Sequence, residues 1–257
     1  MDSLHHRLAV AAVLTTTAAS AVPPGAATAP SAPPAPAPLA VLLPGSGELV
    51  IDHFADHVRA LRVLSRANSA GAAEHVTARF EHRESVVTGG EARLAVALRY
   101  LPPVEVEDSL VMRVGGLVPE YERQRVQGTT TTVRYDGPRV WGTVTTGDST
   151  RAFDHTFAHA VFPMNAIGAV VRSLPFAAGA ERVIPVFSAQ NGSITYDTVR
   201  VVRAERHPAL DRRVWYVQFA TPDAVTSYLV DAASREIVAQ QLVLRADGTS
   251  VRLALAR

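Results

Sequence analysis

The sequence contains no cysteine and no lysine, so all 25 of its Lys-or-Arg residues are arginines. The absence of cysteine excludes disulfides, thiolate zinc sites, a cysteine nucleophile and a lipid-modified N-terminal cysteine. The absence of lysine excludes a Schiff-base lysine and the phosphate-binding lysine of a P-loop. With 24 acidic residues the net charge is only +1, which gives no electrostatic basis for binding nucleic acid or an anionic membrane.

Recognisable catalytic and nucleotide-binding motifs are missing as well. The sequence has no G-x-G-x-x-G and no paired-carboxylate motif, so neither nucleotide binding nor glycosidase chemistry is supported. Pro44-Gly45-Ser46-Gly47 comes nearest to a serine elbow, but it precedes the predicted strands and is interpreted as an entry loop. We therefore expect a protein that is not an enzyme and uses no cofactor.

The first 38 residues predict an exported protein. A weakly basic start, a short apolar stretch and small residues at Ala19 and Ala21 are typical of a signal peptide over residues 1–21. An uncleaved anchor is the alternative, although the apolar run is short for a membrane span. Residues 22–38 consist almost wholly of Pro, Ala, Gly, Ser and Thr and predict an extended linker. Residues 39–257 are expected to form a single domain in the periplasm or on the extracellular side of a bacterial envelope.

Apolar and polar residues alternate along most of this domain, which predicts half-buried antiparallel strands. The clearest runs are Val76, Ala78 and Phe80; Leu94, Val96, Leu98 and Tyr100; Trp215, Val217 and Phe219; and Val251, Leu253 and Leu255. Four tight-turn dipeptides predict hairpins, because their residues tolerate positive φ. Gly89-Gly90 is expected to join strands 75–87 and 92–101, Asp136-Gly137 strands 129–135 and 139–146, Asn191-Gly192 strands 182–188 and 194–205, and Asp247-Gly248 strands 236–245 and 249–256.

Two segments show helical periodicity instead. Ile167, Val170, Val171 and Leu174 follow an i, i+3, i+4, i+7 pattern between Pro163 and Pro175, which predicts a helix over 163–174. A similar stripe predicts a short helix near 51–58, running into a strand near 60–66. The fold class that follows is mainly β, a long antiparallel meander forming a curved sheet or half-barrel with one or two short helices on its concave side.

Two histidine pairs have the i, i+4 spacing of a helical metal site, His53 with His57 and His155 with His159. Neither lies in H-E-x-x-H, and the sequence identifies no third ligand, so we predict no metal site. His53 and His57 are interpreted as a polar helix face, and His155 and His159 as loop surface. Asp231 is interpreted as a turn-capping residue between two strands.

Several stretches together resemble a known family. They run from Leu117-Val118-Pro119 to Val144 and from Phe162 to Val202, followed by Val214–Val217, Tyr228–Asp231 and Arg235–Val238. Residues 109–244 are thereby similar to an uncharacterised group of exported bacterial proteins, a domain-of-unknown-function family with the half-barrel fold of the lipoprotein carriers (LolA/LolB-like). The resemblance implies helices on the concave side of the sheet and no known catalytic residues. In the carriers, the cavity between sheet and helices accepts acyl chains.

Two functions follow from these observations. The first is a non-catalytic exported binding protein that holds a lipid or other apolar ligand between the curved sheet and the helix. Its candidate binding residues, which could equally be core residues, are Ile167, Val170, Val171, Leu174, Trp141 and Trp215. The second is a structural or protein-interaction module of the envelope that binds a protein partner through exposed strand edges. An interior cavity would favour the first function, and a filled interior the second.

Overall fold

The computed structural model describes residues 39–69, 71–102, 105–208 and 210–255. The predicted signal peptide (1–21) and linker (22–38) lie outside these residues. The described part contains fifteen strands, a 3-10 helix η1 (Met164–Ala166) and an α-helix α2 (Ile167–Ser173). The strands are β1 (His57–Arg66), β2 (His75–Val87), β3 (Arg93–Tyr100), β4 (Val106–Arg113), β5 (Val118–Val126), β6 (Thr129–Asp136), β7 (Arg139–Thr146), β8 (Ser149–Thr156), β9 (Phe162–Pro163), β10 (Glu181–Ser188), β11 (Ser193–His207), β12 (Arg212–Ala220), β13 (Ala224–Asp231), β14 (Ile237–Leu244) and β15 (Ser250–Leu255).

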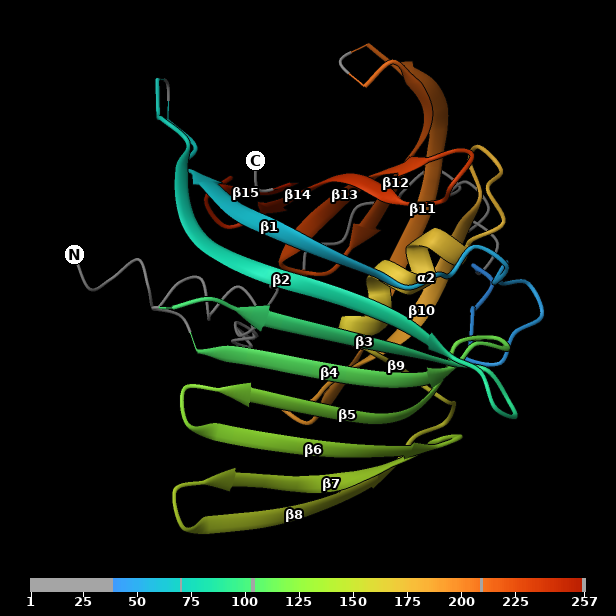
Figure 1. Cartoon of the computed structure of the whole chain (residues 1–257), viewed down its shortest axis with the longest axis vertical. Helices are drawn as coiled ribbons and strands as arrows, with labels where there is room; N and C mark the ends of the chain where they lie inside the picture. Colours follow the sequence, from blue (N-terminus) through green and yellow to red (C-terminus); the bar gives the residue numbers. More distant parts are fainter. Residues whose placement is uncertain (1–38, 70, 103–104, 209, 256–257) are drawn as a thin grey trace, which may run out of the picture.

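All fifteen strands belong to one sheet, in the order β8-β7-β6-β5-β4-β3-β2-β1-β15-β14-β13-β12-β11-β10-β9. Neighbouring strands are antiparallel, except that the short β9 runs parallel to β10. The sheet therefore consists of two meanders, β1–β8 and β10–β15, which are joined where β1 pairs with β15 (Figure 1), and β9 is added parallel to β10 at one end. This arrangement confirms the predicted mainly β fold with a long antiparallel meander.

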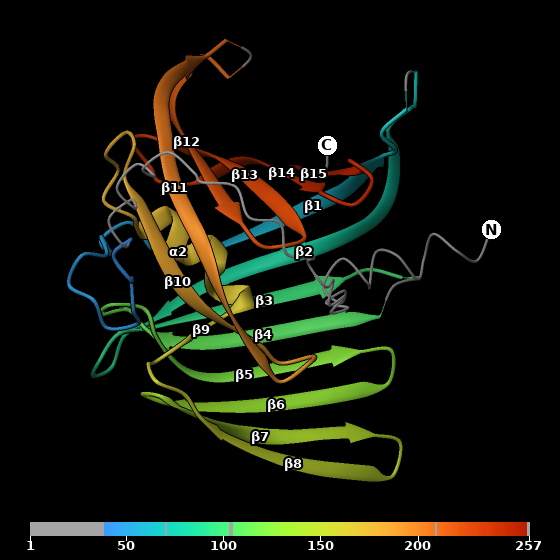
Figure 2. The same ribbon diagram turned by 180° about the vertical axis from the view of Figure 1, so that it is seen from behind.

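The sheet curls until its two ends overlap. Figures 1 and 2 show β10 and β11 crossing one side of the β3–β5 region, with α2 between the two layers. β9 contacts β5, and a small core cluster joins Val133 of β6 and Val140 of β7 to Phe187 of β10. The hydrogen-bonded order nevertheless remains linear, with β8 and β9 at its two ends, so the barrel is not closed by strand pairing.

Each of the four predicted hairpins is present. Gly89-Gly90 separates β2 from β3, Asp136-Gly137 separates β6 from β7, Asn191-Gly192 separates β10 from β11, and Asp247-Gly248 separates β14 from β15. Gly137, Gly192 and Gly248 have φ between 55° and 69°, the left-handed region that a side chain disfavours. These turns confirm that the local sequence determines where the chain reverses its direction.

The helix predicted over 163–174 is present as η1 followed by α2, and it lies on the concave side of the sheet. Ile167, Val170, Val171 and Leu174 are each at most 3% exposed and belong to the main hydrophobic core. The core includes Leu94 and Leu110 from the first meander and residues of β10–β13 from the second. The helix is thus the common packing surface of both meanders.

The predicted helix near 51–58 is wrong. Residues 51–56 form turns and irregular structure, and β1 begins at His57. Ile51 and Phe54 pack against the main core from this irregular segment, while Val58 is 56% exposed on β1. The apolar residues that looked like a helical stripe therefore belong to two different kinds of structure.

Among the described residues, no helix is long and apolar enough to span a membrane.

Candidate functional site

A cavity of about 300 Å³ lies between the helical segment and the inner face of the sheet. Its helical side is formed by η1 and α2, including Asn165, Ile167, Gly168 and Arg172, and its sheet side by residues of β1–β4 and β13–β15. Ligand pockets in proteins usually have volumes of roughly 300–1,000 Å³. The cavity is therefore large enough for a small or slender ligand.

The strand register arranges the sheet side of this cavity in three rows. Residues within a row are register partners on neighbouring strands, and successive rows are two residues apart, so all point inward. The rows are His57–Glu84–Val96–Leu110, then Arg59–His82–Leu98–Asp108, then Leu61–Phe80–Tyr100. The charged and imidazole groups thus occupy the first two rows, and the third row is hydrophobic and aromatic.

Glu84, in the first row, forms a buried ion pair with Arg172 of α2. Nη1 of Arg172 donates to both carboxylate oxygens of Glu84 at 2.7 Å, and the side chains of Arg172 and Glu84 are 6% and 4% exposed. Arg172 is also held by other contacts, because its Nε donates to the carbonyl oxygen of Arg235 and its guanidinium lies 5.0 Å from the centre of the Phe54 ring. The pair ties α2 to β2 across the cavity.

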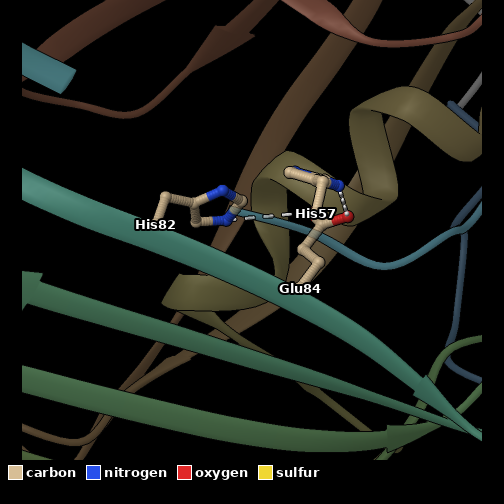
Figure 3. A group of neighbouring side chains, drawn as sticks. All are labelled: His57, His82 and Glu84. Carbon is tan, nitrogen blue, oxygen red and sulfur yellow. Dashed lines mark ion pairs between the residues drawn. The ribbon is translucent and has the colours of Figure 1, made fainter. Parts of the chain in front are cut away.

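Two imidazoles stand beside Glu84 (Figure 3). Nδ1 of His57 lies 3.6 Å from Oε2 of Glu84, and Nε2 of His82 lies 3.7 Å from Oε1. Burial lowers the pKa of His82 below its ordinary value, against the opposing charge of Glu84. His82 is therefore neutral at pH 7, with one ring nitrogen free of a proton.

A second buried cluster anchors η1 to the sheet. Asn165 donates its amide to Oδ2 of Asp108 and, at 2.7 Å, to Oε1 of Glu122, while the Tyr135 hydroxyl donates to Oε2 of Glu122 at 2.6 Å. Burial raises the pKa of Asp108 to about 6. Burial and the nearby Asp108 carboxyl raise the pKa of Glu122 to about 8, so Glu122 is mainly protonated at pH 7.

A cleft of about 610 Å³ opens on the other side of the Arg172 side chain. Arg172 and His57 line both this outer cleft and the inner cavity. The outer cleft also contains exposed Asp52 and Asp56. His53 lies in the same cleft, and burial followed by the charge of Arg172 lowers its pKa to about 4.

Comparison with known proteins places the chain in a family. Residues 58–248 match a family model described as a protein of unknown function, DUF3108. The chain belongs to the DUF3108 family. A solved β-barrel-like protein of another domain of unknown function, DUF1849, from Brucella abortus is 12% identical, with a TM-score of 0.49 over 79% of this chain and 97% of that chain. A search of curated proteins found no match. The predicted resemblance to an uncharacterised domain family is thereby confirmed.

One of the six candidate binding residues of this DUF3108 chain, Ile167, lines the inner cavity. Val170, Val171 and Leu174 lie on α2 and at its end, but face the packed core. Trp215 packs against the edge of that core and stacks on Phe176, with ring centres 5.4 Å apart. None of these four is among the residues that line the cavity, and their predicted role in ligand binding stays a prediction.

Trp141, the sixth candidate, lies on the face of β7 opposite the buried Val140. The guanidinium of Arg139, on the same face, lies 4.9 Å from the centre of its ring. Alternation along the strand therefore directs Trp141 away from the interior.

The histidine interpretations need two corrections. His53 and His57 do not share a helix face, since His57 begins β1, and His155 lies in β8 rather than in a loop. His159 is exposed outside the strands, as predicted. Asp231 caps a turn as predicted, because its Oδ1 accepts from the backbone amides of Ala233 and Ser234 at 2.9 Å.

The sequence reasoning missed the polar residues of the cavity. His82 and Glu84 were unnoticed because they lie in the polar run Glu81-His82-Arg83-Glu84-Ser85, which is typical of a solvated strand. Arg172 did leave a signal. It is the one charged residue among the apolar residues of the predicted 163–174 helix, and a charge on such a helix needs a buried partner or a route to solvent.

Proposed function

We propose that this protein is an exported, non-catalytic binding protein that holds an apolar or amphipathic ligand, such as a lipid or acyl chain, in the inner cavity. The observation that carries the proposal is the cavity itself, about 300 Å³ between the helical segment and the sheet. The amino-terminal pattern of residues 1–21 supports the export part of the proposal.

The distribution of side chains around the cavity supports an amphipathic ligand. The row Leu61–Phe80–Tyr100, together with Leu253 and Ile237, offers apolar contact to a hydrocarbon chain. Burial of such a chain is favourable by about 25 cal/mol for each Å² removed from water. The first two rows offer the imidazoles of His57 and His82 and the guanidinium of Arg59 to a polar group of the ligand.

The alternative function, an envelope interaction module, has one feature in its favour. Among the described strands, β8 stands at the end of the sheet and pairs along one edge only, and six of its eight residues are exposed. Such edges can accept a strand from a partner. The cavity favours the binding protein, and the interaction module becomes the conclusion if the cavity takes no ligand.

Native mass spectrometry of the protein purified from its own envelope, followed by solvent extraction, is the direct test. We expect an extractable apolar molecule at a ratio near one to one. Gly168 allows a sharper test, because it lines the cavity and a Cβ placed there would meet only Cδ1 of Ile237, at 3.7 Å.

Gly168→Leu should place a branched side chain in the cavity while keeping the helix, and Gly168→Ala is the matched control. With cis-parinaric acid as a fluorescent acyl-chain probe, the leucine variant should bind at least about tenfold more weakly, a loss of ~1.4 kcal/mol. The alanine variant should bind almost like the wild type. A clean mass without ligand, together with no saturable binding of the probe by the wild type, would overturn the proposal.

A further inference from the structure

The three side chains His57, His82 and Glu84 meet on the inner face of two neighbouring strands. His57 and Glu84 are register partners on β1 and β2, and His82 lies two residues before Glu84, so all three point to the same side of the sheet. Figure 3 shows them turned toward one another. One potential ligand atom from each of the three residues lies within 4.8 Å of the other two.

The distances suit a small divalent ion. With Zn–N and Zn–O bonds of about 2.0–2.2 Å, two ligand atoms of a tetrahedral site are about 3.3–3.5 Å apart. The distance of 3.7 Å from Nε2 of His82 to Oε1 of Glu84 is only a few tenths of an ångström longer. Nδ1 of His57 lies 3.6 Å from the other oxygen, Oε2, and also 3.3 Å from the carbonyl oxygen of Ala55, so Nε2 is the nitrogen of His57 that is available to an ion. Two histidines and one glutamate also form a common three-residue zinc donor set, which leaves a fourth position for water or another molecule.

The hydrogen bonds of these residues leave donor atoms available. A carboxylate has about four lone-pair sites on its two oxygens, so each oxygen of Glu84 accepts from Arg172 and still keeps a lone pair for an ion. Arg172 has independent anchors in the Arg235 carbonyl and the Phe54 ring. Among the described residues, the buried Nε2 of His57 has no hydrogen-bond partner, so this imidazole is not held by bonds at both nitrogens.

An ion would also have a path to the cluster. His57 lines both the inner cavity and the outer cleft. The outer cleft carries the carboxylates of Asp52, Asp56 and Glu236 beside the guanidinium groups of Arg172 and Arg235, so its lining is close to neutral and leaves the path open to an ion.

We propose that His57, His82 and Glu84 form a binding site for a divalent transition-metal ion, with Zn²⁺ as the best fit to the donor set. Arg172 is a positioning residue that holds the Glu84 carboxylate in place. The site shares His57 and His82 with the polar end of the proposed ligand cavity, but it needs no ligand in the hydrophobic part of the cavity.

The test measures Zn²⁺ binding to purified protein that has been stripped with a chelator. Equilibrium dialysis with elemental analysis should give one Zn²⁺ per chain for the wild type. His57→Gln and His82→Gln should each weaken binding by more than about 100-fold, beyond the loss usual for residues that only support a metal ligand. The matched control is His75→Gln, on the same strand as His82 but exposed, and it should bind like the wild type.

Two further measurements keep the proposal falsifiable if a histidine variant folds poorly. Stoichiometric Zn²⁺ should raise the melting temperature of the wild type and of His75→Gln, because an ion that binds only the folded state stabilises it. Co²⁺ added to the wild type should give a saturable visible absorption band at one equivalent, which Zn²⁺ abolishes by displacement. The absence of one-to-one binding in the wild type, or equal affinity in His82→Gln and His75→Gln, would overturn the proposal.

Discussion

Replacing Glu122 with glutamine should change how the stability of the protein depends on pH. Glu122 is 1% exposed, and it accepts hydrogen bonds from Asn165 and Tyr135. Burial raises its pKa from 4.5 to about 8. Folding therefore favours the protonated form of Glu122, and protonation in turn contributes to the stability of the folded protein. This contribution is fully present below about pH 4.5, and it is lost as the pH rises through about 8.

The size of the effect follows from the two pKa values. They differ by about 3.5 (8 minus 4.5), and each unit corresponds to ~1.36 kcal/mol. Relative to the fully protonated state, ionisation in the unfolded chain destabilises the fold by about 1 kcal/mol at pH 5 and about 4 kcal/mol at pH 8. Glu122→Gln carries no titrating group at this position. Its free energy of unfolding should therefore rise relative to that of the wild type by about 3 kcal/mol between these two pH values.

Urea unfolding of both proteins at pH 5, 6, 7 and 8 measures this difference directly. Glu107→Gln is the control, because Glu107 is about half exposed on the neighbouring β4 and pairs with Arg99 at the surface. Its free energy of unfolding should follow that of the wild type. Parallel curves for Glu122→Gln and the wild type would show that Glu122 is ionised in the folded protein, and would refute the reasoning.

Two further substitutions test the packing of the helix. Arg172→Met should lower the free energy of unfolding by about 3–5 kcal/mol, because it leaves the buried Glu84 carboxylate without its cation. Its control, Arg139→Met, removes an exposed pair with Asp154 and should show no measurable change. Equal effects of the two substitutions in urea unfolding would contradict the buried pairing of Arg172 with Glu84. Leu174→Ala should cost about 2–5 kcal/mol as a buried truncation, whereas Trp141→Ala should cost about 1 kcal/mol or less because it loses mainly a surface contact with Arg139. A larger loss for Trp141→Ala than for Leu174→Ala in thermal unfolding would place Trp141 inside the fold.

The strands, the hairpins and the helix over 163–174 could be predicted because their signals are local. Alternation in a strand and a turn dipeptide such as Asp136-Gly137 depend on a few neighbouring residues. The helix predicted before β1 was wrong because it, too, rested on a local pattern alone. Ile51 and Phe54 have a helical spacing, but their burial is achieved by packing of an irregular segment against the main core, which no local pattern reveals.

The polar part of the cavity could not be predicted because it depends on register between distant strands. Glu84 meets His57 across 27 positions of sequence (84 minus 57) and Arg172 across 88. Asp108 and Glu122 become neighbours only when β4 pairs with β5 and Asn165 of η1 docks between them. The i, i+4 spacing paired His57 with His53, whereas the structure places His57 beside His82 and Glu84.

The pairing of β1 with β15 has a consequence for the order in which the protein folds. Leu61 pairs with Leu255, near opposite ends of the described chain, so this joint has one of the largest sequence separations in the molecule. Contacts of high sequence separation slow folding, because the loop entropy is lost before the contacts form. Until β15 docks, each meander has an open edge, at β1 in one and at β14 in the other. The interval before docking is when the chain is most exposed to aggregation through these edges, and a chaperone that shields the edge of β1 would act at this step.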